Sequence, residues 1–461
     1  MLSFASAAIL FLILSFGFRL PARFAPAKAL AQAPAPRPAG QKERQKQPPQ
    51  EEPAGIVIQD NDFYDNNVSA LHIRGSRVLV EKCSIHRNGN AGLVVDNDAQ
   101  VLVQDNQIYG QEGAGITVMG KGSARASITG NQIYQNTMAG VQLGAQDRLE
   151  VAVRESFRKN PSAGFAGKKD NTTGKKVIVA RVHNNRIYRN GESGIKCQSE
   201  YPNHAVHLTA TQNKIFRNQK GGIFLASAAT VVLQHNSICD NHKAGVSANE
   251  LKEISPQVDI YQNVIRGNEE AGLEITAAKC GPVGVCNNLI FNNGGSGIRF
   301  KTMPMRIINN TIASNGNLAE GSGIDQQGRG TPLIASNILA YNFKTGLNVA
   351  RTKGCSYNLL FANGGSGTCC DDCTSSSKAI ESKELGGHSR SRGDLICDPM
   401  FSNPDLFDYR LKQYSPAIDA GFPSREFHDR HFPPSQGGSS NDLGFTGGPL
   451  AVSWDPNDLA P

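Results

Sequence analysis

Aromatic and arginine side chains occur next to each other at a fixed spacing in the sequence. Two such pairs, Tyr188–Arg189 and Phe216–Arg217, are separated by 28 positions. Aromatic rings pack against sugar rings, and arginine pairs bidentately with carboxylates. This chemistry predicts binding of an acidic polysaccharide. The candidate binding residues are Tyr134, Tyr188, Arg189, Lys196, Phe216 and Arg217.

A basic segment precedes these pairs. Residues 144–176 contain eight Lys and Arg against four Asp and Glu, in a chain whose formal net charge is +7. The segment is either a loop that grips an acidic polymer or a degenerate repeat with a solvated loop. We expect no nucleic-acid partner, because the segment offers few aromatic rings on which bases could stack.

The ten cysteines leave two interpretations open. Cys280 and Cys286 flank a short loop, and a disulfide-stapled C-terminal cap is expected from the Cys-rich end of the chain. The cysteines of this predicted cap are Cys355, Cys369, Cys370, Cys373 and Cys397. A metal site using Cys373 with Asp371 or Asp372 is the alternative, although a second CxxC pair is missing. We therefore expect no metal and no cofactor.

A repeat must position all of these residues. The segment NNRIYRNGESGI (184–195) has close variants along the chain, about two dozen residues apart. A second Asn follows the first by five positions in eleven of twelve copies, and Gly follows it by nine in ten. The position three before the first Asn is always apolar. The first Asn of each copy, with Cys83 in place of one, falls at Asn61, Asn106, Asn131, Asn185, Asn213, Asn236, Asn263, Asn288, Asn310, Asn337 and Asn358.

Apolar and polar residues alternate around each Asn, which is the spacing of strands rather than helices. Repeats of this length form stacked units. The sequence therefore predicts an all-β, single-stranded parallel β-helix of about twelve coils. We expect Asn106, Asn131, Asn185, Asn213, Asn236, Asn263, Asn288 and Asn310 to form a side-chain ladder and to tolerate left-handed backbone geometry, and each Gly to supply a positive φ at the next bend.

The pattern N-x-I-x-x-N-x-x-x-G-I resembles right-handed parallel β-helix repeat proteins of the pectin-lyase-like superfamily. The resemblance covers about Gly55 to Gly367, and CDPMFSNPDLFDYRLKQYSPAIDAG (397–421) is similar to the closing segment of exported bacterial members. It implies repeats over 55–368, with the insertion at 144–176, followed by a Cys-rich irregular cap and tail over 369–461. Members usually cover the first coil, whereas here the repeats begin at about Ile56.

This fold carries lyases, hydrolases, epimerases and structural proteins, so it leaves activity open. Motifs of the polygalacturonase-type hydrolases are misplaced: the Asp371–Asp372 pair lies in the expected cap, and His388 lies outside the repeats. The alginate epimerase signature D-P-H-D is absent. Arg189, Arg217 and Lys196 could neutralise a uronate, but no constellation marks a catalytic site.

The N-terminus is typical of an exported protein. Residues 1–31 form an apolar run followed by AKALA, as in a secretory signal peptide, although a retained anchor remains an alternative because the basic residues follow the run. Residues 32–54 are a Pro-rich, disordered tether. We therefore predict a secreted, periplasmic or cell-surface protein that binds or organises carbohydrate. The alternatives are a lyase or epimerase acting on an acidic glycan, and a structural or adhesion rod.

The aromatic residues three positions after the first Asn leave a further choice open. They should point outward and form a stripe along stacked coils. That stripe is either a glycan platform or an aromatic stack that covers the corner of each coil. The residues are Tyr64, Tyr109, Tyr134, Tyr188, Phe216, Phe291 and Phe361.

Overall fold

The structure is a computed structural model. It describes residues 55–119, 122–144, 176–198, 204–226, 230–248, 257–276, 282–301, 305–316, 320–365 and 391–454. The chain divides into Met1–Glu52 and Pro53–Pro461, and all described residues belong to the second unit. The predicted signal peptide and tether, most of the basic insertion and the cysteines at 369, 370 and 373 therefore lie outside the described residues.

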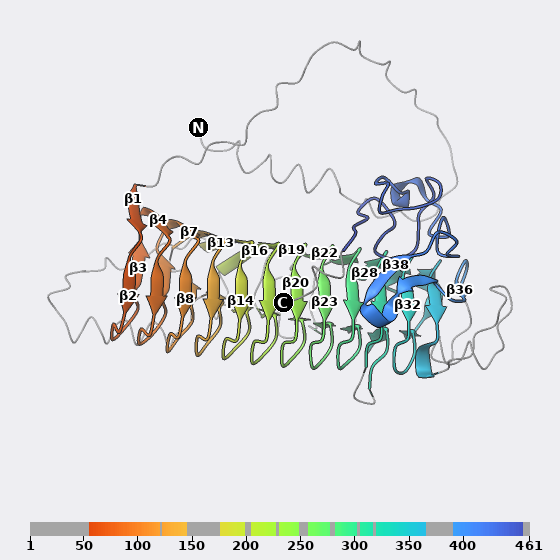
Figure 1. Ribbon diagram of the computed structural model, residues 1–461, viewed down its shortest axis with the longest axis horizontal. Helices are drawn as coiled ribbons and strands as arrows, with labels where there is room; N and C mark the ends of the chain where they lie inside the picture. Colours follow the sequence, from red (N-terminus) through yellow and green to blue (C-terminus); the bar gives the residue numbers. More distant parts are fainter. Residues whose placement is uncertain are drawn as a thin grey trace, which may run out of the picture. The chain divides into compact units, whose positions relative to one another are not determined.

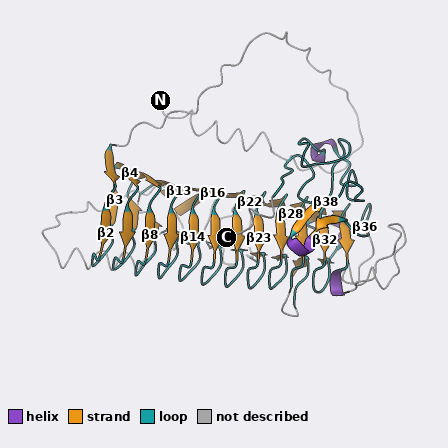
Figure 2. Cartoon of the chain, in the orientation of Figure 1, coloured by secondary structure: helices purple, strands orange, loops and turns teal. Residues whose placement is uncertain are grey.

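The described residues form a parallel β-helix, which confirms the predicted fold class. Each coil contributes one strand to each of three parallel sheets, here named A, B and C, and successive coils lie side by side (Figure 1). Strands and loops make up nearly all of the described chain, and the few helical turns are short (Figure 2). In this part of the chain no helix is long and apolar enough to span a membrane.

Sheet A contains twelve strands among the described residues. They are β1 (Ile56–Gln59), β4 (Arg77–Glu81), β7 (Gln100–Gln104), β10 (Ala124–Thr129), β13 (Lys176–His183), β16 (His204–Thr211), β19 (Thr230–Gln234), β22 (Gln257–Tyr261), β25 (Val283–Cys286), β28 (Met305–Ile308), β31 (Leu333–Ala335) and β34 (Cys355–Ser356).

Sheet B contains thirteen strands in the same ranges. They are β2 (Asp62–Tyr64), β5 (Ser84–His86), β8 (Gln107–Tyr109), β11 (Gln132–Tyr134), β14 (Arg186–Tyr188), β17 (Lys214–Phe216), β20 (Ser237–Cys239), β23 (Val264–Arg266), β26 (Leu289–Phe291), β29 (Thr311–Ala313), β32 (Ile338–Ala340), β35 (Leu359–Phe361) and β36 (Leu395–Ile396).

Sheet C contains eleven strands, again counting described residues. They are β3 (Leu71–Arg74), β6 (Leu93–Asp96), β9 (Ile116–Val118), β12 (Val141–Leu143), β15 (Ile195–Cys197), β18 (Ile223–Leu225), β21 (Val246–Ser247), β24 (Leu273–Ile275), β27 (Ile298–Phe300), β30 (Ile324–Gln326) and β33 (Leu347–Asn348). The remaining elements are the antiparallel pair β37 (Phe401–Asn403) and β38 (Asp408–Leu411) and the 3-10 turns η1 (Thr352–Gly354), η2 (Asn363–Gly365), η3 (Pro404–Leu406) and η4 (Arg425–Phe427).

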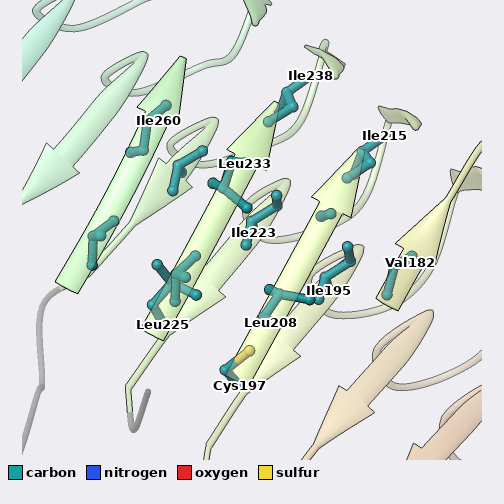
Figure 3. Packing of buried hydrophobic residues seen from close by; sticks show 14 of the residues in the cluster. Val182, Ile195, Cys197, Leu208, Ile215, Ile223, Leu225, Leu233, Ile238 and Ile260 are labelled. Carbon is teal, nitrogen blue, oxygen red and sulfur yellow. The ribbon is translucent and has the colours of Figure 1, made fainter. Parts of the chain in front are cut away.

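The core lies inside the coils, where the inward residues of all three sheets meet. Val182 from sheet A, Ile187 from sheet B, and Ile195 and Cys197 from sheet C are all fully buried. Figure 3 shows how such side chains from successive coils pack against one another. Because strand residues alternate between faces, the neighbours of these residues must point outward. The alternation in the sequence therefore decides which residues are available at the surface.

Asparagine ladders join the coils at the corner between sheets A and B. The Nδ2 of Asn185 donates to Oδ1 of Asn213 at 3.0 Å, and Nδ2 of Asn213 donates to Oδ1 of Asn236 at 2.9 Å. The same bond runs from Asn106 through every first-position Asn to Asn358. Cys83 takes part without an amide: its Sγ bonds to the carbonyl of Ile58, and its backbone N–H donates to Oδ1 of Asn106.

Two of the roles expected for the repeat residues were wrong. The left-handed residue is the one before the ladder Asn, for example Asn184 with φ 51°, while the ladder Asn residues are absent from the positive-φ residues. The Gly nine positions after the Asn also lacks a positive φ. It is required for space, because a Cβ on Gly272 would lie 2.6 Å from Cγ2 of Ile290 and 2.7 Å from the carbonyl oxygen of Gly297.

The C-terminal segment, from β37 to residue 454, packs on the outer face of sheet B over its last coils. Phe291 stacks at a tilt against Phe407 and Tyr409, with ring centroids 5.1 and 5.2 Å apart. Figure 1 shows this segment in blue beside β32 and β36. At the other end of the sheets, Ile56 and Val57 of β1 are 51% and 55% exposed. Strand β1 has only β4 as a neighbour in sheet A.

The described residues do not show the expected disulfides. Cys286 and Cys355 carry free thiols. Cys355 points into the core of the coils, whereas Cys397 packs under the C-terminal segment, so the two lie on different sides of sheet B. Cys280 and the TCCDDC stretch lie outside the described residues.

Candidate functional site

The six candidate binding residues lie on two different surfaces. Tyr134, Tyr188 and Phe216 end β11, β14 and β17 and are in register on the outer face of sheet B. Arg189 and Arg217 follow at the corner, exposed and each with φ 54°. Lys196 instead lies on the outer face of sheet C, in β15. The structure therefore brings five of the residues together and separates Lys196 from them.

The aromatic residues of sheet B stack on one another. Neighbouring ring centroids are 4.9 to 5.3 Å apart and the planes differ by at most 11°. Neighbouring rings therefore cover both faces of each inner ring, leaving mainly ring edges toward solvent. This arrangement favours the covering role over a platform for sugar rings. The stack is Tyr64, His86, Tyr109, Tyr134, Tyr188 and Phe216, in which His86 was not anticipated.

A groove on the outer face of sheet C combines charges with one unstacked aromatic ring. It encloses ≈ 240 Å³. Four consecutive coils supply two rows of residues, one from the turns that precede the strands and one from the strands themselves. The turn row is Glu192, Lys220, Lys243 and Glu270, and the strand row is Lys196, Phe224, Ser247 and Glu274.

The repeat fixes both rows. In sheet C, Lys196 is in register with Phe224, Phe224 with Ser247, and Ser247 with Glu274. In the turns, the backbone N–H of Lys220 donates to the carbonyl of Glu192 at 3.3 Å. Residues that are 23 to 28 positions apart in sequence therefore become neighbours about 4.8 Å apart in the sheet.

Ion pairs bridge the rows at one end of the groove. Glu192 accepts hydrogen bonds from Nζ of Lys196 at 2.7 Å and from Nζ of Lys220 at 2.8 Å. Burial alone would raise the pKa of Glu192, but the hydrogen bonds from the two lysines outweigh it and lower the pKa below its usual value. Glu192 is therefore a carboxylate at neutral pH.

The other end carries a second pair. Nζ of Lys243 lies 2.7 Å from Oε1 of Glu270, and this hydrogen bond raises the pKa of Lys243. Three lysines thus face three glutamates in the groove, so their charges balance. The groove can offer hydrogen-bond donors and acceptors on both sides without a strong net field.

Phe224 is the aromatic residue that the sequence reasoning missed. It is half-buried, and no other ring stacks on it within the described residues. It occupies the variable position of the G-apolar-x-apolar segment, which points outward from sheet C. The signal was available, because the other residues in this row are not Phe, Tyr or Trp. They are His72, Val94, Thr117, Gln142, Lys196, Ser247, Glu274, Arg299, Asp325 and Asn348.

The arrangement limits the chemistry. In the described residues no three His, Cys, Asp or Glu side chains are grouped to hold a metal ion. Glu192 and Glu270 are three coils apart, about 14 Å along the stack. Paired carboxylates that hydrolyse glycosides are about 5–9.5 Å apart. These two carboxylates are therefore poorly placed for direct hydrolysis.

Comparison with solved structures finds five matching chains, three of which are described below. The crystal structure of pectate lyase Pel9A shares 14% identity, with a TM-score of 0.41, over 80% of this chain and 86% of that chain. The A-module of mannuronan C-5 epimerase AlgE6 from Azotobacter vinelandii shares 13%, with a TM-score of 0.39, over 67% and 84%. Tailspike protein 2 of bacteriophage CBA120 shares 11%, with a TM-score of 0.35, over 64% and 46%.

Comparison with curated proteins finds no match. The family described as "Right handed beta helix region" matches residues 51–178 and 156–302, which together cover more than half of the 461 residues. The chain belongs to the right-handed β-helix family.

Proposed function

We propose that this protein binds carbohydrate in the groove on the outer face of sheet C. The observation that carries the proposal is the position of Phe224 in the strand row, beside the charged turn row; its ring points outward, and no ring among the described residues stacks on it. A sugar has an apolar C–H face and a rim of hydroxyl groups. The ring suits that face, and the carboxylates and ammonium groups suit the rim.

The balanced charges favour an oligosaccharide recognised through its hydroxyl groups. Glu192 and Glu270 accept hydrogen bonds from hydroxyls, and Lys196, Lys220 and Lys243 donate to them. Polar groups fixed by ion pairs also lose little freedom when a ligand arrives, which supports affinity. A glycan chain lying along the stack would contact successive coils.

A lyase or epimerase remains the second candidate, because a carboxylate and two lysines meet at one end of the groove. Removing a sugar proton next to a carboxylate needs a base and a cation that neutralises the acid. The lowered pKa of Glu192 makes it a weak base, so this candidate has less support than binding.

The proposed place of action is outside the cytoplasm, at the cell envelope or surface. This part rests on the signal-like residues 1–31, which lie outside the described residues. Appearance of the full chain in the culture medium or periplasmic fraction, together with loss of the first 31 residues, would support it. Retention of the whole chain in the cytoplasm would contradict it.

Titration calorimetry with a panel of neutral and uronic oligosaccharides tests the proposed function. Phe224→Ala should weaken binding about three- to tenfold, the loss expected for one stacked ring. Lys220→Ala should also weaken it. The matched control is Lys344→Ala, because Lys344 occupies the same turn position several coils away and is exposed.

The outcomes separate the candidates. Binding that depends on Phe224 while the glycan keeps its length supports the proposal. New absorbance from unsaturated chain ends, or epimerised products, would move the assignment to the second candidate. Absence of binding to every oligosaccharide would contradict both and favour a structural or adhesion rod.

A further inference from the structure

We propose that a second surface, on the outer corner of sheet B, binds an acidic polysaccharide. This basic patch consists of Arg186, Arg189, Lys214 and Arg217 on two adjacent coils. It is distinct from the groove, because its side chains project from sheet B and its corner rather than from sheet C. Only the choice of a glycan as the partner rests on the proposed function.

The patch follows from the register of two coils. Arg186 pairs with Lys214, and Tyr188 with Phe216. Arg189 donates its backbone N–H to the carbonyl of Phe216, which places Arg189 and Arg217 on neighbouring coils, about 4.8 Å apart along the stack. Both corner arginines are exposed, and neither forms an ion pair with any described residue.

The aromatic stack holds part of the patch in place. The guanidinium carbon of Arg186 lies 6.0 Å from the ring centroid of Tyr188 and 5.4 Å from that of Phe216. Arg186 therefore leans over the rings as a cation–π partner. In the next coil Asp240 occupies the corner position equivalent to that of Arg217, and it pairs with Arg266 at 3.6 Å.

A polyanionic glycan fits these features better than a nucleic acid. Single-stranded nucleic acids need open aromatic faces for base stacking, whereas the inner rings of this stack cover one another. Arginines on neighbouring coils can instead hold successive carboxylates bidentately.

The test uses the full chain and long polygalacturonate as the probe. The variant is Arg189→Gln with Arg217→Gln. Glutamine suits these positions, because Gln135 occupies the equivalent corner with φ 52°. The control, Arg329→Gln with Arg351→Gln, removes the same charge from exposed sites elsewhere. Binding is measured at low and high salt by affinity electrophoresis.

The corner variant should lose at least about tenfold in affinity at low salt, and the control should stay within about twofold. High salt should abolish most of the difference, because exposed charges are screened. Equal losses in both variants, or no loss in either, would overturn the inference. Equal competition by single-stranded DNA would overturn the choice of a glycan.

The two proposals can fail separately. Phe224→Ala should leave polygalacturonate binding at the corner within about twofold, and the corner variant should leave oligosaccharide binding in the groove unchanged. Loss of oligosaccharide binding alone contradicts the proposed function. If the corner variant binds polygalacturonate as tightly as its control while oligosaccharide binding in the groove is retained, only this inference is contradicted.

Discussion

Removal of one ladder asparagine in a central coil should destabilise the β-helix by several kcal/mol. Asn263 is fully buried. Its Nδ2 donates to the carbonyls of Leu233 at 2.9 Å and Tyr261 at 3.0 Å, and to Oδ1 of Asn288 at 3.0 Å. Its Oδ1 accepts from the backbone N–H and Nδ2 of Asn236, both at 2.9 Å. Asn263→Ala removes all five bonds at once.

The cost follows from the group left without a partner. The buried backbone N–H of Asn236 loses the acceptor that the structure gives it. One such group costs about 1–3 kcal/mol, and the other lost bonds and the lost volume bring the expected total to about 3–5 kcal/mol. Amide hydrogen exchange of Asn236 is the most local readout, and urea unfolding measures the total.

A matched variant makes the result interpretable. Gln219→Ala changes an exposed amide two coils away and should alter stability by less than about 0.5 kcal/mol. Two results together would contradict a stabilising role of the ladder. The Asn236 amide would exchange no faster in Asn263→Ala than in the wild-type protein, and the two proteins would unfold at the same urea concentration.

Three further predictions concern stability. Burial raises the pKa of Asp442 to about 7 and that of Asp429 to about 6, from 3.8. The folded state therefore binds more protons than the unfolded chain between about pH 4 and 7. The contribution of these two carboxyls to the stability of the C-terminal segment should be fully present below about pH 4 and lost as pH rises through 6 to 7. Protease protection of that segment measured from pH 4 to 8 checks this, and Asp442→Asn should flatten the profile. Gly272→Ala should lower the urea midpoint, because its Cβ would meet backbone at 2.7 Å, while Gly55→Ala, with its nearest atom at 3.6 Å, should not. Cys83→Asn should extend the ladder and stabilise the first coils by about 1 kcal/mol, seen as slower exchange of the Asn61 amide.

The repeat was sufficient to predict the fold because each repeated residue makes the same contact in every coil. A residue such as Asn213 contacts Asn236 only if every coil brings the same position to the same corner. The recurrence of Asn in the sequence therefore predicts the contact directly. Backbone conformation was harder to predict. Left-handed geometry falls on Asn184, one position before the ladder residue. The recurrence of residues in the repeat does not indicate which of two adjacent residues takes the left-handed conformation.

The candidate site was predicted only in part, because the repeat pattern does not indicate how aromatic rings are oriented. The sequence placed Tyr188 and Phe216 outward, but their stacking at 4.9 Å, which covers the ring faces, depends on side-chain torsions. The sequence did not reveal Phe224 because the predicted site rests on residues that recur, whereas Phe224 is the one aromatic residue in its described row. The bond between Glu192 and Lys220 joins coils through variable positions and carries no repeating signal.

A crystal structure of the protein soaked with the tightest-binding oligosaccharide from the panel would show whether the groove on sheet C binds carbohydrate. We expect a sugar ring lying over Phe224, with its hydroxyl groups bonded to Glu192, Lys196 or Lys220. A sugar bound elsewhere on the coils, with the groove on sheet C empty, would contradict it.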